Sequence, residues 1–168
     1  MTSPQVGILM GSDSDFPVME AACKMLDYFK IAYEVKVSSA HRTPKQTSAY
    51  AQTARERGIR ALIIGAGAAA HLAGVVASET TLPVIGVPID ASPLKGVDAL
   101  YATVMMPGGI PVATMAIGKA GAKNAAIYVA SMFSMTDKVM ADRLKQYRTD
   151  MVAQVQAKSE ALQSKLKS

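Results

Sequence analysis

The sequence predicts an α/β fold in which helices cover both faces of a parallel sheet. Short apolar runs alternate with amphipathic segments along most of the 168 residues, as they do in repeated strand–helix–strand units. A polar or glycine-containing segment follows each apolar run. Because the crossovers of a parallel sheet are right-handed and ligands bind at the carboxyl ends of its strands, we expect these segments to gather at one edge.

The first half of the chain predicts two strands and two helices. VGILM (Val6–Met10) is a compact buried strand, and YEVKVSS alternates like a second. A helix lies between them, with Pro17 in its first turn. One face of this helix is apolar, formed by Val18, Ala22, Met25, Leu26 and Phe29. TPKQTSAYAQTARERG predicts the next helix, with Gly58 as its C-terminal stop.

The second half continues the alternation. ALIIGAG is the third strand, and a helix starts near His71. PVIGVPI is the fourth strand, and YATVMMPGGIPV contains the fifth. From about Ile110 to Met135 the chain is rich in Ala, Gly, Met and Ile, which predicts a helix that packs closely on several sides. We expect a single catalytic domain over 1–168, with a core at about 5–135 and a C-terminal helix at about 136–165.

Composition narrows the class of protein. Half of the residues are hydrophobic and 18% are charged, which indicates an ordered globule whose surface is partly covered by self-association. The lone Cys23 lies in an apolar helical pattern, so we expect an inert core thiol and a reducing, cytoplasmic setting. Two histidines and one cysteine offer no metal-ligand spacing.

Nucleic-acid and membrane partners are not expected. The net charge is +5, but much of the excess follows Thr136, where both signs mix at helical spacing as on a solvated helix face. No basic segment precedes the N-terminal apolar run. The uncharged runs Ala61–Ser78 and Ala99–Gly118 approach the length of a membrane span, but glycines interrupt both and prolines the second. We therefore expect a soluble protein.

The segments that follow the strands carry the candidate site: GSDSD, SAHRTP, GAGAAAH, GVP and MPGGIPVAT. GSDSD combines a glycine turn, two hydroxyls and a helix N-terminus, which favours an anion. Ser12 and Ser14 could bind a phosphate while Asp15 accepts from sugar hydroxyls. Helix capping by Ser14 or Asp15 explains the same residues.

SAHRTP follows the second strand, and Thr43 with Pro44 marks the start of a helix. Ser39, His41 and Arg42 should therefore lie at the ligand-binding edge. The planar guanidinium of Arg42 suits phosphate, and His41 can carry a proton near neutral pH. An exposed loop histidine without a function is the alternative.

GAGAAAHLAG has glycines where the backbone approaches another group closely. It lacks the glycine that a dinucleotide-binding fingerprint needs at Ala70. The helix dipole favours neutral His71, a better hydrogen-bond donor than a base. A histidine that is only packed at the helix start is the alternative.

Together, GSDSD, SAHRTP, GAGAAAHLAGV, GVP, MPGGIPVAT and GKAGAKNAA resemble one family closely, the class I N5-carboxyaminoimidazole ribonucleotide mutases of bacterial purine biosynthesis. The resemblance runs from Val6 to about Arg148 in the same order and spacing. It implies a three-layer αβα, flavodoxin-like domain, a homo-octamer with sites at subunit contacts, and a ribonucleotide substrate. It also implies a reaction without metal, ATP or organic cofactor, in which CO2 is a trapped intermediate.

The resemblance also implies a role for each site residue. His41 is the general acid/base. The ribose phosphate end is held by Ser12, Ser14, Asp15, Ser39 and Arg42, with Ala40 in the same loop. The backbone of Gly67, Ala68 and Ala69 and the side chain of His71 face the base and its carboxylate.

The chain departs from the family at Ala68 and Ala73, where glycine and proline are common, and Gly108 occupies a variable position. Two other functions compete. Class II relatives are carboxylases that use CO2 and aminoimidazole ribonucleotide directly, although Arg42 favours the mutase. A non-catalytic nucleotide-binding regulator on the same fold is the third possibility, since a fold does not fix a function.

Overall fold

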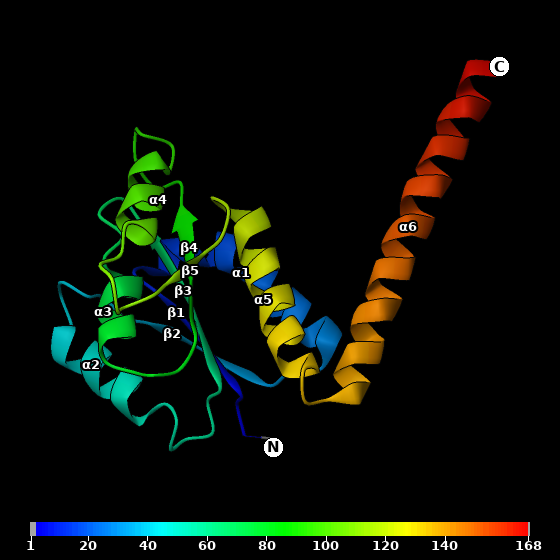
Figure 1. Ribbon diagram of the computed structural model, residues 1–168. Helices are drawn as coiled ribbons and strands as arrows, with labels where there is room; N and C mark the ends of the chain where they lie inside the picture. The colour runs from blue at the N-terminus through cyan, green and yellow to red at the C-terminus, as the bar shows by residue number, and fades with distance from the viewer. Residues whose placement is uncertain (1–2, 168) are drawn as a thin grey trace. The chain divides into compact units, whose positions relative to one another are not determined.

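The computed structural model describes residues 3–167 and contains a five-stranded parallel sheet (Figure 1). The strands are β1 (Val6–Met10), β2 (Tyr33–Val37), β3 (Ala61–Gly67), β4 (Val84–Ile89) and β5 (Ala113–Thr114). Their order across the sheet is β2-β1-β3-β4-β5. This is the flavodoxin-like order, so the predicted fold class is confirmed.

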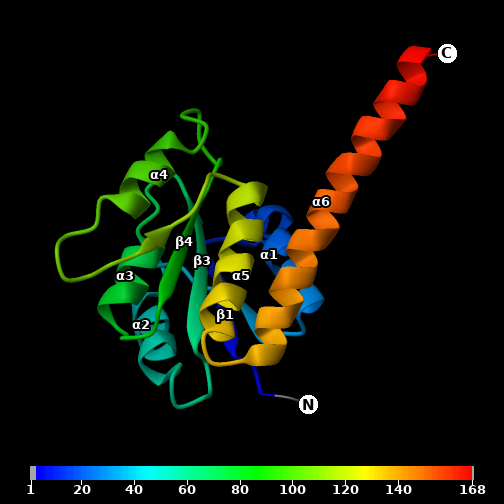
Figure 2. The ribbon, with the colours of Figure 1, turned by 45° about the vertical axis from the view of Figure 1, so that its right-hand side comes forward.

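Helices form a layer on each face of the sheet (Figures 1 and 2). On one face lie α1 (Phe16–Phe29) and the first part of α5 (Lys119–Ser134). On the other lie α2 (Pro44–Thr53), α3 (Leu72–Ser78) and α4 (Val97–Val104). A short 3-10 helix, η1 (Asp13–Asp15), precedes α1. The arrangement gives the three layers that the sequence predicts.

The chain forms two compact units, one up to Val129 and one from Ala130. The first holds the sheet, α1 to α4 and most of α5. The second holds the end of α5 and α6 (Lys138–Lys167), a helix of 30 residues. The predicted C-terminal helical extension is therefore confirmed, while a single catalytic domain over the whole chain stays a prediction.

The core of the first unit lies on both faces of the sheet. All five residues of β1 are buried. Leu9, Leu62 and Ile64 belong to the apolar cluster on the side of α2 and α3. Gly7 leaves room for the packing on this side, because a β-carbon there would meet the Tyr50 hydroxyl and lie 2.8 Å from Leu62 Cδ2, so these side chains would have to shift.

The apolar face of α1 is close to the prediction. Ala22, Leu26 and Phe29 are buried, but Val18 and Met25 are only half-buried. Met19, which the pattern did not include, is fully buried. The helix therefore faces the sheet about one position away from the predicted stripe.

The predicted fifth strand is wrong. Its first residues belong to α4, and β5 consists of Ala113 and Thr114, just after the predicted segment. Tyr, Thr and Val favour strands, but Ala99 and Thr103 are buried at helical spacing. Packing of this segment on β4 as a helix therefore outweighs the strand propensity of its residues.

Three other boundaries also differ. The helix expected from Ile110 begins at Lys119, after the prolines. GVP lies inside β4 rather than after it. Helix α2 ends at Thr53, and Gly58, with φ of +91°, ends the turn that follows. Within residues 3–167, no helix is both long and apolar enough to span a bilayer.

Candidate active site

A pocket of about 360 Å³ lies at the carboxyl ends of β1, β2 and β3. It sits where the strand order reverses between β1 and β3, the usual ligand position in such sheets. Every residue predicted for the site lines it: Ser12, Ser14, Asp15, Ser39, Ala40, His41, Arg42, Gly67, Ala68, Ala69 and His71. The structure thus brings three loops distant in the sequence to one pocket.

The loop after β1 is held by reciprocal capping. Ser12 caps η1 by accepting a hydrogen bond from the Ser14 backbone N–H at 3.3 Å, and its own N–H donates to Asp15 Oδ2 at 3.1 Å. Asp15 is buried, which raises its pKa, while the backbone N–H groups of Ser12 and Gly11 act in the opposite direction. Capping is therefore present, with Ser12 rather than Ser14 as the cap, and the loop still presents two hydroxyls to the pocket.

The loop after β2 is tied to the loop after β1 by Arg42. Its Nη2 donates to the Gly11 carbonyl at 3.3 Å, and its backbone N–H donates to Ser39 Oγ at 3.1 Å. The side chain is exposed at the pocket. A guanidinium beside two serine loops forms a site that attracts an anion.

His41 and His71 contact each other across the pocket. Nε2 of His41 lies 2.8 Å from Nδ1 of His71, and their rings are nearly perpendicular, at 81°. One ring must donate its N–H and the other must accept it, so the bond requires at least one neutral imidazole. The pair can hold and hand over a proton beside a bound ligand.

The loop after β3 is compact and strained at one residue. Ala68 has φ of +50°, in the left-handed region that favours glycine. The N–H of Ala70 donates to the Ala68 carbonyl at 2.9 Å, and the N–H of His71 donates to the Ala69 carbonyl at 2.6 Å. These tight turns carry the chain from β3 to His71 at the start of α3.

Sequence reasoning missed the contribution of the segment after β4. Ala91 lines the pocket, and a β-carbon on Gly67 would lie 2.5 Å from its methyl group. The close approach predicted for this glycine is therefore made to the end of β4. The signal was a small residue, Ala91, two positions after the fourth apolar run.

A larger cavity of about 600 Å³ lies between α2 and α3, near the amino end of β4. Its polar groups already pair with each other, Gln52 with Glu79 at 2.7 Å and Arg55 with Thr81 at 3.0 Å. It contains neither histidine. The chemistry therefore favours the smaller pocket. Over residues 3–167, no three His, Cys, Asp or Glu side chains are grouped as a metal site.

Residues 5–154 match the AIR carboxylase family, and this range includes every loop of the pocket. The chain belongs to this family. It is 52% identical over 159 residues to the N5-carboxyaminoimidazole ribonucleotide mutase of Bacillus subtilis, covering 95% of this chain and 98% of that one. It is 55% identical over 148 residues to the enzyme of the same name from Pyrococcus abyssi, covering 88% and 84%.

The fold is also that of a solved relative. The crystal structure of Treponema denticola PurE matches this chain with a TM-score of 0.84 and 30% sequence identity. The match covers 95% of this chain and 98% of the Treponema denticola chain. The resemblance inferred from the loop motifs is thus confirmed over nearly the whole length.

Proposed function

We propose that this chain is an N5-carboxyaminoimidazole ribonucleotide mutase of purine biosynthesis. It converts N5-carboxyaminoimidazole ribonucleotide to 4-carboxy-5-aminoimidazole ribonucleotide. The observation that carries the proposal is the near full-length identity of about half with two mutases. The pocket that gathers His41, Arg42 and His71 gives it a chemical basis.

His41 is the general acid/base in this proposal. It gives a proton to the carbamate nitrogen, the N–C bond breaks with its electron pair going to nitrogen, and CO2 is released. The ring carbon then attacks CO2, and the proton on that carbon returns to His41. One proton enters and one leaves, and an imidazole can both donate and accept a proton.

His71 is the hydrogen-bond partner of His41 and faces the carboxylate of the substrate. The 2.8 Å contact between the rings supports this arrangement, because a partner that accepts or donates at Nδ1 orients the imidazole of His41. Ser12, Ser14, Asp15, Ser39 and Arg42 hold the ribose phosphate end. Their hydroxyls, backbone N–H groups and one guanidinium support an anionic ligand at this end of the pocket.

The remaining wall suits the retention of CO2. Alanine and glycine fill positions 66–70, and Ala91 closes the side next to β4. Small apolar side chains offer neither CO2 nor water a hydrogen-bond partner, so a bound ribonucleotide displaces water from this wall at little cost. Exclusion of water keeps the released CO2 beside the ring carbon that must capture it.

The test is a turnover assay of the purified protein with two substrates. The carbamate ribonucleotide is compared with aminoimidazole ribonucleotide plus bicarbonate, in buffer that contains a chelator and no ATP. A mutase consumes the carbamate faster than solution does and shows little use of bicarbonate. The carboxylase alternative, which the name of the family favours, predicts the reverse, and a regulator predicts no turnover of either.

We further propose that the enzyme is a cytoplasmic homo-octamer. Apolar side chains remain exposed on α4, where Val97 is 47% and Tyr101 63% exposed, and along α6, where Val155 is 67% exposed. Exposed apolar faces of this kind support association with further copies. Cys23 is buried and free, in keeping with a reducing compartment.

A further inference from the structure

We propose that Ser38 and Thr47 are positioning residues that hold the His41 loop, residues 39–42, in the geometry that the reaction needs. The inference rests on the proposed function, because it assigns these two hydroxyls to the same site. Neither residue lines the pocket. Ser38 and Thr47 would therefore act by holding the His41 loop and not by contacting the substrate.

Both side chains are polar and almost completely buried. Ser38 is 4% exposed and Thr47 is 0% exposed. Their hydroxyl oxygens lie 2.7 Å apart. A buried hydroxyl without a partner is unfavourable, so each of these residues depends on the other.

The direction of the hydrogen bond follows from the number of protons. Thr47 Oγ1 lies 3.1 Å from the Thr43 carbonyl oxygen and 3.4 Å from that of Ser39. Either hydroxyl can donate across the 2.7 Å contact between Ser38 and Thr47. When the single hydroxyl proton of Thr47 goes to one of these carbonyls, which only accept, Ser38 donates to Thr47. The hydrogen bonds therefore run from the end of β2 through Thr47 to the backbone that flanks the His41 loop.

The loop itself is closed by Thr43. The Ser39 carbonyl accepts from the Thr43 backbone N–H at 2.9 Å and from its hydroxyl at 3.0 Å, and the Ser39 N–H donates to Thr43 Oγ1 at 3.0 Å. Ser38 extends the pairing of the sheet, since its N–H donates to the Met10 carbonyl at 2.8 Å. The Ser38–Thr47 bond thus fixes a closed loop to the sheet and to the first turn of α2.

The positions of the His41 and Arg42 side chains depend on the Ser38–Thr47 bond that fixes the loop. His41 reaches His71 at 2.8 Å, and Arg42 reaches the Gly11 carbonyl at 3.3 Å. Both contacts join the His41 loop to other loops of the pocket. Catalytic groups must be placed within a fraction of an ångström, so a small shift of the loop lowers the rate.

The experiment measures turnover of the carbamate substrate by Thr47→Val and Ser38→Ala. Valine has the shape of threonine without the hydroxyl. We expect kcat/KM to fall about tenfold in each variant. Thr47→Ser keeps the hydroxyl and should restore kcat/KM to within about twofold of the wild type. Wild-type kcat/KM in folded Thr47→Val would overturn the proposal.

Thr103→Val is the matched control. Thr103 is also a buried helical threonine, 2% exposed, whose hydroxyl donates to the Ala99 carbonyl at 2.7 Å, but it lies in α4 away from the pocket. Loss of the Thr103 hydroxyl should lower the melting temperature about as much as loss of the Thr47 hydroxyl does, but it should leave kcat/KM unchanged. If Thr103→Val loses as much activity as Thr47→Val, the effect comes from stability alone and the proposal fails.

A second measurement does not depend on turnover. The chain has only two histidines, so nitrogen-15 spectra report the tautomer pattern of His41 and His71 directly. Thr47→Val should change both sets of ring signals, and Thr103→Val should not. Unchanged signals in Thr47→Val would overturn the positioning role. If the signals change in Thr47→Val but the unmutated protein does not turn over the carbamate, the positioning role stands and the proposed function is wrong.

Discussion

Ala68 is the residue where the pocket stores backbone strain. Its φ of +50° puts a β-carbon in the left-handed region, next to the glycine that ends β3. Such a conformation costs a non-glycine residue on the order of 1–2 kcal/mol. The family resemblance places glycine at this position, and the geometry explains why glycine suits it.

Ala68→Gly should therefore stabilise the protein. Relief of the strain outweighs the added entropy of the unfolded chain, and we expect a net gain of about 0.5–1 kcal/mol in the free energy of unfolding. Urea denaturation of the two proteins measures it. Ala69→Gly is the control, because Ala69 is exposed in the same loop and has no positive φ. An equal change in the free energy of unfolding in both variants would contradict the conclusion that Ala68 is strained.

The residues of the site were more predictable than their contacts. Position after a strand was enough to bring Ser12, Arg42 and His71 to one edge of the sheet. The contact of His41 with His71 was not predictable, because it depends on how far the loops after β2 and β3 reach toward each other over the end of β1, which lies between them. The buried pair of Ser38 and Thr47 was not predictable either, since the amino-acid sequence does not distinguish a buried serine or threonine hydroxyl from an exposed one.

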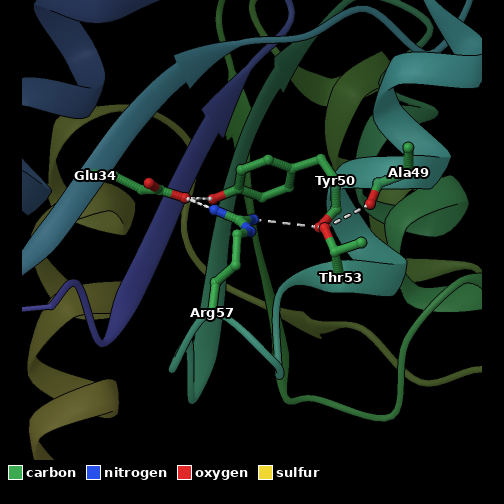
Figure 3. Close-up of polar contacts among 5 residues, drawn as sticks. All are labelled: Glu34, Ala49, Tyr50, Thr53 and Arg57. Atoms are coloured by element: carbon green, nitrogen blue, oxygen red, sulfur yellow. Dashed lines mark hydrogen bonds and ion pairs between the residues drawn. The ribbon is translucent and has the colours of Figure 1, made fainter.

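At the scale of elements, a polar cluster joins β2 to α2 and the turn after it (Figure 3). The Tyr50 hydroxyl donates to Glu34 Oε1 at 2.7 Å, and the Arg57 guanidinium forms an ion pair with the same oxygen at 2.5 Å. The guanidinium also lies 4.4 Å from the centroid of the Tyr50 ring. Since β2 is an edge strand, this cluster fastens the edge of the sheet that ends at the His41 loop.

The cluster should make stability fall in acid. Burial alone would raise the pKa of Glu34, but the hydrogen bonds from Tyr50 and Arg57 outweigh it and hold the pKa below its usual value. A carboxyl group with a lowered folded pKa contributes stability above its unfolded pKa and loses it as the pH falls through the folded pKa. The contribution is therefore complete at neutral pH and is lost in the acid range.

Glu34→Gln should lower the free energy of unfolding by about 1 kcal/mol at neutral pH, a value reduced for its partial exposure. The difference from the wild type should shrink in acid, where Glu34 is protonated. Urea denaturation at about pH 7 and about pH 3 tests this. Glu20→Gln is the control, because the pair of Glu20 with Lys24 is an exposed contact within α1. A difference that stays constant with pH would contradict the role of the Glu34 charge.

The elements themselves were largely predictable where their burial is uniform. β1, β3 and β4 are short apolar runs buried on both faces, and each was found with nearly its observed bounds. The segment from α4 to β5 was not, because β5 is only two residues long and partly exposed. A strand so short has no periodicity of its own, and its pairing with β4 depends on tertiary contacts.

At the scale of the whole molecule, the proposed octamer requires that exposed apolar faces be covered. Light scattering should give a mass about eight times the 17.7 kDa of the chain. Tyr101→Glu puts a charge on the exposed face of α4, where Tyr101 is 63% exposed, and should yield smaller species. Lys24→Gln, an exposed change on α1, should not. A wild-type mass near that of one chain would contradict the assembly.

The central claim is that His41 carries the protons of the mutase reaction, and His41→Asn tests it most directly. Asparagine keeps a polar side chain of similar reach but cannot exchange a proton near neutral pH. Turnover of the carbamate and binding of the ribonucleotide are measured on the same preparation. We expect kcat to fall by about 10²- to 10⁴-fold while the ribonucleotide still binds. Wild-type turnover by His41→Asn would contradict it.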